Sequence, residues 1–432
     1  MRAMPMLSLY ILTFNCGREL VNPEYLAPSL FDALPEAAPI PDVVAISLQE
    51  IAPIAESFLG GSHLKPYLDR ISTTVHLATD LHSNGSEQLQ HVATRSLGMT
   101  ALLIFAKPHV VQRIQWIQAA AVGVGFWNMG NKGAVGMRLG LSSESSGETL
   151  NLAFAAAHLA PAEKNVELRN QDWENIVRNL VFHNDHDSLY SFSEEIPLAS
   201  LGNPPSDNNA LFAPGSHLVF AGDLNYRTSD QPPMPDSHKT YPQPTTDESS
   251  TQHFSHLLKK DQLNREKDAN RTLHSLEELP INFPPTYKYS VRKFPDGQKR
   301  SASDEDEQFD WAKHRYPSWC DRILYLPPPV PAKLEAHIYT SLPVQPSSDH
   351  RPVALSLSID DQPLPRDPDS VRVSPPFSLN PSWRARQDAA RRWEIVIGTL
   401  AYLGLTKKGN AIVVVATSAV FATWYLSAWL RR

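Results

Sequence analysis

The stretch Val219-Phe-Ala-Gly-Asp-Leu-Asn-Tyr-Arg227 decides how the rest of the chain is interpreted. Its apolar first half, which starts at Leu218, has the β-branched and aromatic composition of a buried strand and stops at Gly222. Asp223 and Asn225 follow two positions apart, so in an extended segment their side chains point the same way. A carboxylate beside an amide at a strand end suits water activation and oxyanion binding. The alternative is a plain Asp-x-Asn turn that caps the strand.

The composition of the 432-residue chain limits the classes of function. The length predicts one large domain with appendages. Lys and Arg number 39 against 46 Asp and Glu, a net charge of −7, which argues against a general nucleic-acid binder. Two cysteines, Cys16 and Cys320, are too few for a disulfide framework or a cysteine-rich zinc site, and they fit a reducing compartment. Residues 1–14 do not have the pattern of a secretory signal peptide.

Apolar runs that end in polar residues recur along residues 1–359, and they predict a mixed α/β domain whose strand-end polar groups meet at one rim. The polar segments 228–252 and 292–310 interrupt this pattern and are expected to be mobile surface loops. We expect a helix at 162–181 and strands at 7–14, 42–50, 97–105, 114–124, 134–139, 149–157, 218–224, 322–326, 334–340 and 353–359.

The C-terminal part of the chain has a different composition. Residues 360–394 are rich in proline, aspartate and serine, and we expect an extended linker there. Residues 395–432 are predicted to form a membrane tail anchor. Within them, 411–430 is a run of 20 uncharged residues with aromatic side chains near one end, which matches one bilayer span. A buried core helix is the alternative, but such a helix would be expected to show a polar face.

Polar clusters follow or lie within the apolar runs of the domain. A single buried histidine is more often a satisfied core group than a catalyst, and a single strand-end glutamate is more often a surface charge. Several clusters in one domain instead favour a shared site. The clusters are Asn15; Gln49-Glu50; His158; Asp223 with Asn225; Trp319-Cys-Asp-Arg322; and Ser348-Asp-His350.

Longer blocks surround these clusters, namely Gly130-Asn-Lys-Gly133, Ala157-His-Leu159, Gly222-Asp-Leu-Asn-Tyr-Arg227, Pro284-Pro-Thr-Tyr-Lys288, Arg315-Tyr-Pro-Ser-Trp-Cys-Asp-Arg-Ile-Leu324 and Ser348-Asp-His-Arg-Pro352. With these blocks, the chain resembles the inositol polyphosphate 5-phosphatase family over about residues 7–359. The wider superfamily, which includes DNase I-like nucleases and sphingomyelinases, would share only Glu50, the Asp-x-Asn and the Ser-Asp-His. The resemblance implies a four-layer α/β/β/α sandwich with two central sheets and an active site at one rim, followed by the linker and one C-terminal transmembrane helix.

The resemblance implies a Mg²⁺-dependent phosphatase. Glu50 would bind the metal with Asn15 close by, since Mg²⁺ prefers hard oxygen ligands and needs few of them from the protein. The metal would neutralise a phosphate oxygen and the leaving hydroxyl. Asp223 would orient and deprotonate the attacking water, and Asn225 and His158 would donate hydrogen bonds to the phosphoryl oxygens.

The last matching block supplies a second histidine. By resemblance, His350 would contact the scissile phosphate, and Asp321 would hold its ring and favour the charged form. Asp349 would be a carboxylate beside the metal or behind its ligands. The chain departs from the family pattern at Phe14-Asn-Cys-Gly17, where Trp-Asn-Val-Asn is usual, and at Ala157, where Ser is common.

Substrate selection would fall to basic residues that break no bond. Arginine suits bidentate contact with phosphate, whereas lysine supplies a point charge. The resemblance assigns Tyr287, Lys288, Lys313 and Arg315 to the 4-phosphate of the substrate and Asn131 with Lys132 to the 1-phosphate. For Lys313 and Arg315 the alternative is a solvated loop face.

These features predict a membrane-anchored phosphoinositide 5-phosphatase that converts phosphatidylinositol 4,5-bisphosphate to phosphatidylinositol 4-phosphate. The expected partners are the lipid substrate and the membrane, with no nucleic acid and no obligate protein partner. The predicted location is the cytosolic face of the endoplasmic reticulum membrane, and the mitochondrial outer membrane is the alternative. The alternative functions are a superfamily nuclease or other phosphodiesterase, and a catalytically inactive phosphoinositide-binding tether.

Overall fold

The computed structural model describes residues 6–143, 148–184, 189–190, 208–244, 246–290, 308–364 and 375–431. Strands within these residues form two sheets, with the orders β11-β12-β1-β2-β4-β3-β8 and β10-β9-β7-β6-β5. The first sheet contains β1 (Met6–Asn15), β2 (Val43–Gln49), β3 (Gln90–Leu97), β4 (Thr100–Ala106), β8 (Leu189–Tyr190), β11 (Leu334–Ser341) and β12 (Val353–Asp360). The second contains β5 (Ile114–Gly123), β6 (Gly133–Ser142), β7 (Thr149–His158), β9 (Ser216–Asp223) and β10 (Asp321–Tyr325).

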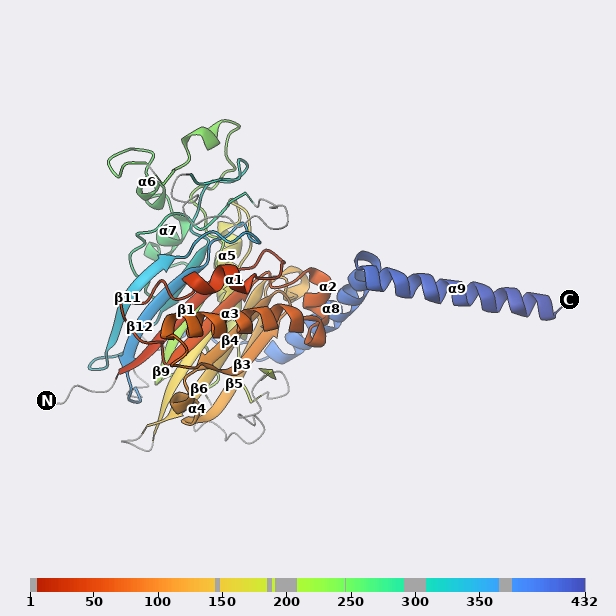
Figure 1. The fold of residues 1–432 in the computed structure, drawn as a ribbon, viewed down its shortest axis with the longest axis horizontal. Coiled ribbons are helices and arrows are strands. Elements are labelled where there is room, and N and C mark those ends of the chain that lie inside the picture. The colour runs from red at the N-terminus through yellow and green to blue at the C-terminus, as the bar shows by residue number, and fades with distance from the viewer. Residues whose placement is uncertain are drawn as a thin grey trace.

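The two sheets pack face to face and helices cover their outer faces (Figure 1). Helices α1 (Pro23–Leu26) and α3 (Lys65–Ser83) lie on the seven-stranded sheet. Helices α5 (Val166–Asn179) and α7 (Gln262–Asp268) lie on the five-stranded sheet. One apolar layer fills the space between the sheets, and a further layer lies under each set of helices. The predicted four-layer sandwich is therefore confirmed.

Strand β4 shows how the sequence specifies two apolar faces. Leu102 and Ile104 belong to the layer between the sheets, whereas Ala101, Leu103 and Phe105 belong to the layer under α3. Successive side chains of a strand point to opposite faces, so an unbroken apolar run places one core on each side. Burial of each large side chain contributes roughly 1.5–3 kcal/mol.

Strand pairing brings the predicted polar strand ends to one rim. In the first sheet, β1 and β2 are parallel and pair Asn15 with Gln49. In the second, β7 and β9 are parallel and pair His158 with Asp223, while the antiparallel β10 places Asp321 opposite Asp223. The ends of four strands and the start of a fifth therefore meet at this rim.

Most predicted strands are confirmed to within three residues, and the helix predicted at 162–181 is α5. The strand predicted at 97–105 is wrong at its start, because the chain turns at Gly98 (φ +51°) between β3 and β4. Strand β3 was missed because its run Gln90-His-Val-Ala-Thr-Arg is largely polar, and helix α3 was also missed. The segment 228–252 contains a short 3-10 helix at Ser237–Thr240, whereas most of 292–310 lies outside the described residues.

The extended linker predicted at 360–394 is wrong from residue 383 onward. Helix α8 (Trp383–Leu405) starts there, crosses the predicted linker–anchor boundary, and packs against α2 (Ile54–Leu59). The prolines that suggested a linker all precede α8, whose run Trp383-Arg-Ala-Arg-Gln-Asp-Ala-Ala is rich in helix formers. Helix α9 (Lys407–Leu430) follows, projects away from the sandwich (Figure 1), and is long and apolar enough to cross a membrane.

Candidate active site

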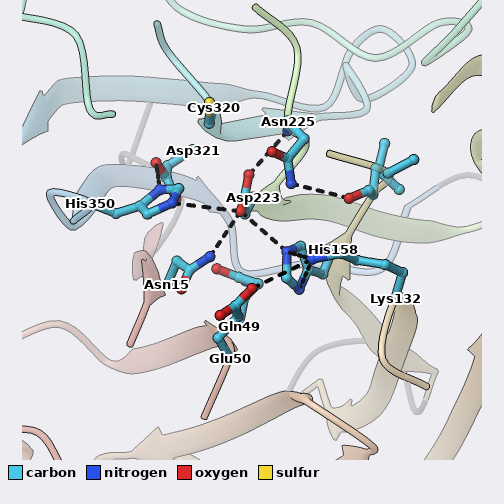
Figure 2. Close-up of polar contacts among 12 residues, drawn as sticks. Asn15, Gln49, Glu50, Lys132, His158, Asp223, Asn225, Cys320, Asp321 and His350 are labelled. Carbon is cyan, nitrogen blue, oxygen red and sulfur yellow. Dashed lines mark hydrogen bonds and ion pairs between the residues drawn. The ribbon is translucent and has the colours of Figure 1, made fainter. Parts of the chain in front are cut away.

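Asp223 lies at the centre of the rim and is only 1% exposed (Figure 2). Its Oδ2 accepts a hydrogen bond from Asn15 Nδ2 at 2.9 Å and lies 3.3 Å from His158 Nε2 and 3.9 Å from His350 Nε2. Its Oδ1 accepts from the backbone N–H of Asn225 at 3.1 Å. Burial alone would raise the pKa of Asp223, but the two histidines outweigh burial and hold the pKa well below its usual range. The central carboxylate is therefore ionised.

Two residues of the rim have a left-handed backbone, namely Asn225 (φ 57°) and Glu50 (φ 46°). Asparagine tolerates this region, whereas for glutamate it costs on the order of 1–3 kcal/mol, which the surrounding structure must supply. Arg227 holds Asn225 by donating to its backbone oxygen at 3.0 Å and to its Oδ1. Asn225 Nδ2 donates to Leu159 O at 3.1 Å, which leaves its second N–H for a substrate oxygen.

His350 approaches Asp223 from one side with a second carboxylate behind it (Figure 2). Its Nδ1 lies 2.8 Å from Asp321 Oδ2, and Thr286 Oγ1 donates to the same oxygen at 2.7 Å. Burial lowers the pKa of His350, but Asp321 and Asp223 together outweigh it and raise the pKa to about 9. His350 therefore carries a positive charge at neutral pH, as the resemblance implied for its pairing with Asp321.

His158 approaches Asp223 from the other side with a cation behind it (Figure 2). Its Nε2 contacts Lys132 Nζ, and Lys132 Nζ lies 3.6 Å from Glu50 Oε1. Burial and the charge of Lys132 both lower the pKa of His158. One ring nitrogen cannot both donate to Asp223 and accept from Lys132, so these two contacts compete. The structure thus brings Lys132 into the centre, beside two residues of the predicted machinery.

Glu50 and Asn15 carry oxygen atoms of the kind that Mg²⁺ prefers as ligands. The Glu50 carboxylate accepts a hydrogen bond from Arg18 Nε at 2.7 Å. Burial alone would raise the pKa of Glu50, but the nearby His158, Lys132 and Arg18 outweigh burial and lower this pKa. Asn15 Oδ1 accepts a hydrogen bond from the backbone N–H of Gly17 at 3.1 Å. Gly17 occupies the position at which the family pattern has a second asparagine. An ionised carboxylate beside an amide oxygen fits a hard divalent cation.

A second group of potential ligands lies nearby, since one atom each of Asp223, Asp321 and His350 lie within 4.8 Å of one another. Its histidine is a poor ligand, because both ring nitrogens of a charged imidazole carry protons. The pKa of His350 and its short contact with Asp321 therefore favour a hydrogen-bonded dyad. The oxygen atoms of Glu50 and Asn15 need no such loss of a proton before they could hold a hard cation.

The residues assigned to the 4-phosphate reach the rim at different depths. Tyr287 is buried, with its ring 4.6 Å from the His350 ring and the Arg227 guanidinium 4.2 Å above it. Lys288 Nζ is paired with Asp349 Oδ2. Asp349 is thus occupied by a lysine, although its Oδ1 also lies 3.8 Å from His350 Nε2.

The other predicted binding residues lie farther out. Arg315 Nε is 3.6 Å from Glu163 Oε1, and Lys313 is exposed. Asn131 packs against Gly125, where a Cβ would meet Asn131 Oδ1 at 2.0 Å. Among the described residues this buried Oδ1 has no hydrogen-bond partner.

Sequence reasoning missed Arg18, Thr286 and Glu163 as neighbours of the site. Their partners lie far away along the chain. Thr286 nevertheless lies within the block Pro284-Pro-Thr-Tyr-Lys288, which was the one local signal that could have indicated it. Arg227 supports its loop through its two contacts with Asn225. Tyr226 has the same role, because its hydroxyl donates to Asn170 and Thr272 in the core.

Comparison with known proteins places the chain among phosphatases and nucleases. Residues 12–356 match the family model described as Endonuclease/Exonuclease/phosphatase family 2. Type II inositol polyphosphate 5-phosphatase 15 of Arabidopsis thaliana is 31% identical over 342 residues, which cover 72% of this chain and 27% of that protein. Inositol-1,4,5-trisphosphate 5-phosphatase 1 of Schizosaccharomyces pombe is 28% identical over 320 residues, or 74% of this chain and 24% of that protein. The chain thus spans about a quarter of the length of these relatives.

A solved structure has the same fold. The inositol polyphosphate 5-phosphatase domain of a synaptojanin, in complex with inositol (1,4)-bisphosphate and a calcium ion, is 24% identical and has a TM-score of 0.57. The match covers 82% of this chain and 85% of that domain. Since the family model spans most of the chain, as the motifs predicted, the protein belongs to the endonuclease/exonuclease/phosphatase family 2.

Proposed function

We propose that the chain is a Mg²⁺-dependent phosphoinositide 5-phosphatase that converts phosphatidylinositol 4,5-bisphosphate to phosphatidylinositol 4-phosphate. The main support is the arrangement around Asp223, where one ionised carboxylate lies between a charged His350 and the His158–Lys132 pair. The names of similar relatives, both inositol phosphate 5-phosphatases, agree with this activity.

Asp223 orients the attacking water. Its low pKa makes it a weak proton acceptor, because base catalysis is most effective when the pKa lies near the working pH. Phosphoryl transfer has a loose transition state that needs little help from a base, so positioning of the water dominates. This proposal gives Asp223 mainly an orienting role and makes its deprotonating role secondary.

The groups around Asp223 bind the phosphoryl oxygens as their charge is redistributed. His350 contributes a full positive charge, and the free N–H of Asn225 contributes a neutral hydrogen bond. His158 and Lys132 line the opposite side. Glu50 and Asn15 would hold Mg²⁺, which when bound supplies charge neutralisation at the phosphate and at the leaving inositol hydroxyl.

Recognition of the 4-phosphate is proposed for the outer basic residues. Lys288 would exchange its partner Asp349 for a phosphate oxygen, and Arg315 would exchange Glu163 in the same way. The exposed Lys313 and the ring of Tyr287 complete this subsite. Asn131 would face the 1-phosphate side.

The membrane attachment is a further part of the proposal. Helix α9 would span the bilayer, and no residue of its apolar window is buried against the domain. We place the catalytic domain on the cytosolic face of the endoplasmic reticulum, with the mitochondrial outer membrane as the alternative. Imaging of a fluorescent fusion carrying residues 391–432 distinguishes the two membranes.

Phosphate release from short-chain phosphatidylinositol 4,5-bisphosphate tests the activity. The full chain in detergent micelles with Mg²⁺ should release phosphate, and Asp223→Asn in the same micelles is the control. Lipid binding without turnover by the wild type would favour the inactive tether. Cleavage of plasmid DNA without phosphate release from lipid would favour a nuclease.

A further inference from the structure

Helix α8 is fixed to the catalytic domain by buried polar contacts. The Glu394 carboxylate, which is 1% exposed, accepts from the backbone N–H of Gly130 at 2.8 Å and from Arg391 Nη1 at 3.1 Å. Arg391 Nη1 also donates to Phe58 O at 2.6 Å. At Gly398 a Cβ would lie 2.9 Å from the Phe58 Cβ, so the missing side chain allows α8 to approach α2 closely. These contacts hold one face of α8 rigidly against the domain.

The two segments that α8 contacts both lead to the active site. Helix α2 starts four residues after Glu50, and the segment 124–132 between β5 and β6 carries Lys132. The ring of Trp393 lies 4.8 Å from that of Trp127 in the same segment. Helix α8 lies outside the residues that match the family and nevertheless supports the active-site rim.

The opposite face of the C-terminal half of α8 is apolar and exposed. Val396 is 47% exposed and Leu400 65%, and Ile395 lies beside them. Val396 and Leu400 are one turn apart, and both lie on the side away from the buried Glu394 and Gly398. The exposed side chains of residues 383–392 are instead polar or small. Exposed apolar surface of this kind marks an interaction site.

The corner between α8 and α9 contains a single residue and is closely packed. Thr406 Oγ1 donates to Tyr402 O at 2.7 Å and accepts from Gly409 N at 2.9 Å, which caps α9. A Cβ at Gly409 would lie 1.9 Å from Tyr402 O, so only glycine allows this contact. The end of α8 is therefore held directly at the start of the candidate membrane span, beside Lys407 and Lys408.

We propose that the exposed apolar face of α8, formed by Ile395, Val396 and Leu400, docks into the interfacial layer of the bilayer that α9 spans. The inference rests on the proposed membrane insertion of α9. An amphipathic helix of this kind lies in the plane of the interface, and the adjacent lysines suit anionic headgroups. Because α8 is rigidly attached to the rim, docking would hold the segment that carries Lys132 at the lipid surface.

Fluorescence quenching tests the position of α8. Cys16 and Cys320 are the only cysteines of the chain and are buried, so a new surface cysteine can be labelled selectively. Full-length Val396→Cys and Leu400→Cys, labelled with nitrobenzoxadiazole, are placed in phosphatidylcholine–phosphatidylserine vesicles containing brominated lipid. Val414→Cys on α9 is the inserted control, and Glu335→Cys on the exposed β11 is the solvent control.

Quenching at 396 and 400 well above that at 335 is the expected result. Equal quenching at 396, 400 and 335 overturns the proposal, and so does an unquenched label at 414, since α9 would then not insert. Disulfide cross-linking of Val396→Cys between two chains without quenching would assign the face to a second copy and also overturn it. None of these signals depends on turnover, so a failure of the phosphatase proposal is recognised separately by the short-chain assay.

A matched pair of variants tests the consequence for turnover. Val396→Glu with Leu400→Glu should lower turnover of bilayer phosphatidylinositol 4,5-bisphosphate about tenfold by weakening docking. Its turnover of the short-chain lipid should stay within about twofold, as for most surface substitutions. Ala385→Glu with Ala389→Glu adds the same charges on the same face about three turns earlier and should change neither by more than about twofold. Docking would be contradicted if both pairs of substitutions lowered turnover of the bilayer lipid equally. It would also be contradicted if the first pair lowered turnover of the bilayer lipid and of the short-chain lipid equally.

Discussion

The two histidines beside Asp223 have similar surroundings at first sight, since both are almost fully buried and both face the same carboxylate. Their pKa values nevertheless move in opposite directions. Asp321 lies behind His350 and helps to raise its pKa to about 9, whereas Lys132 lies behind His158 and adds to the lowering by burial. Burial lowers the pKa of both rings, and the group on the far side of each ring opposes this effect at His350 and adds to it at His158. On the side of Asp223 that His350 occupies, the histidine itself carries the positive charge. On the side that His158 occupies, Lys132 carries it.

The largest effect is expected where the two flanks meet. Asp223→Asn keeps the shape of the side chain but removes the charge that both flanks face, and the water loses its orienting carboxylate. We expect kcat on short-chain phosphatidylinositol 4,5-bisphosphate to fall by about 10³-fold or more. Thermal unfolding checks that the variant is folded. Retention of a tenth of the wild-type rate would contradict a central role for Asp223.

Removing the carboxylate on the His350 flank should shift its titration. In Asp321→Asn, burial is opposed mainly by Asp223, so the pKa of His350 should fall from about 9 toward its usual value. We expect kcat at pH 8 to fall about 100-fold, with partial recovery at pH 6 where the ring regains its proton. The measurement is kcat from pH 5.5 to 9.5. A loss that is uniform across this range would show that Asp321 acts only structurally.

The charge of His350 should also appear in the pH dependence of stability. Its folded-state pKa is raised, so the stabilisation is fully present below the unfolded value of 6.5 and is lost as the pH rises through about 9. The difference in unfolding free energy between the wild type and His350→Asn should therefore shrink by roughly 2–3 kcal/mol between pH 6 and pH 9.5. Denaturant unfolding at several pH values measures this difference in unfolding free energy. A difference that does not change with pH would contradict a charged His350 in the folded state.

The smallest effect is expected on the His158 flank. Lys132→Met removes the cation that helps to lower the pKa of His158, so this ring should titrate at higher pH in the variant. Without Lys132, His158 gains a proton more readily and can itself supply a positive charge on this side of Asp223. We therefore expect kcat/KM to fall only about tenfold. Histidine NMR of the wild type and the variant follows the titration. An unchanged His158 pKa would mean that burial alone sets it.

Much of the site could be predicted because its residues follow strands whose apolar runs are local features. Gly222 to Asn225 illustrates this, since the strand, its end and the polar pair are all visible within a few residues. The linker prediction failed for the opposite reason. Prolines dominate the segment before α8, and the contact that makes α8 part of the domain joins Glu394 to Gly130, which lie 264 residues apart.

The sequence by itself determined most of the strands, the polar strand ends and the apolar C-terminal helix, because alternation, composition and length act over short stretches of chain. The arrangement of the strands in two sheets was implied only by the resemblance of the longer motifs to a known family. Only the tertiary structure decided which histidine is charged, that Lys132 lies in the centre, and that α8 supports the rim. Those properties depend on charges and donors brought within a few ångströms from distant parts of the chain, as Asn15 is brought to Asp223 across 208 residues.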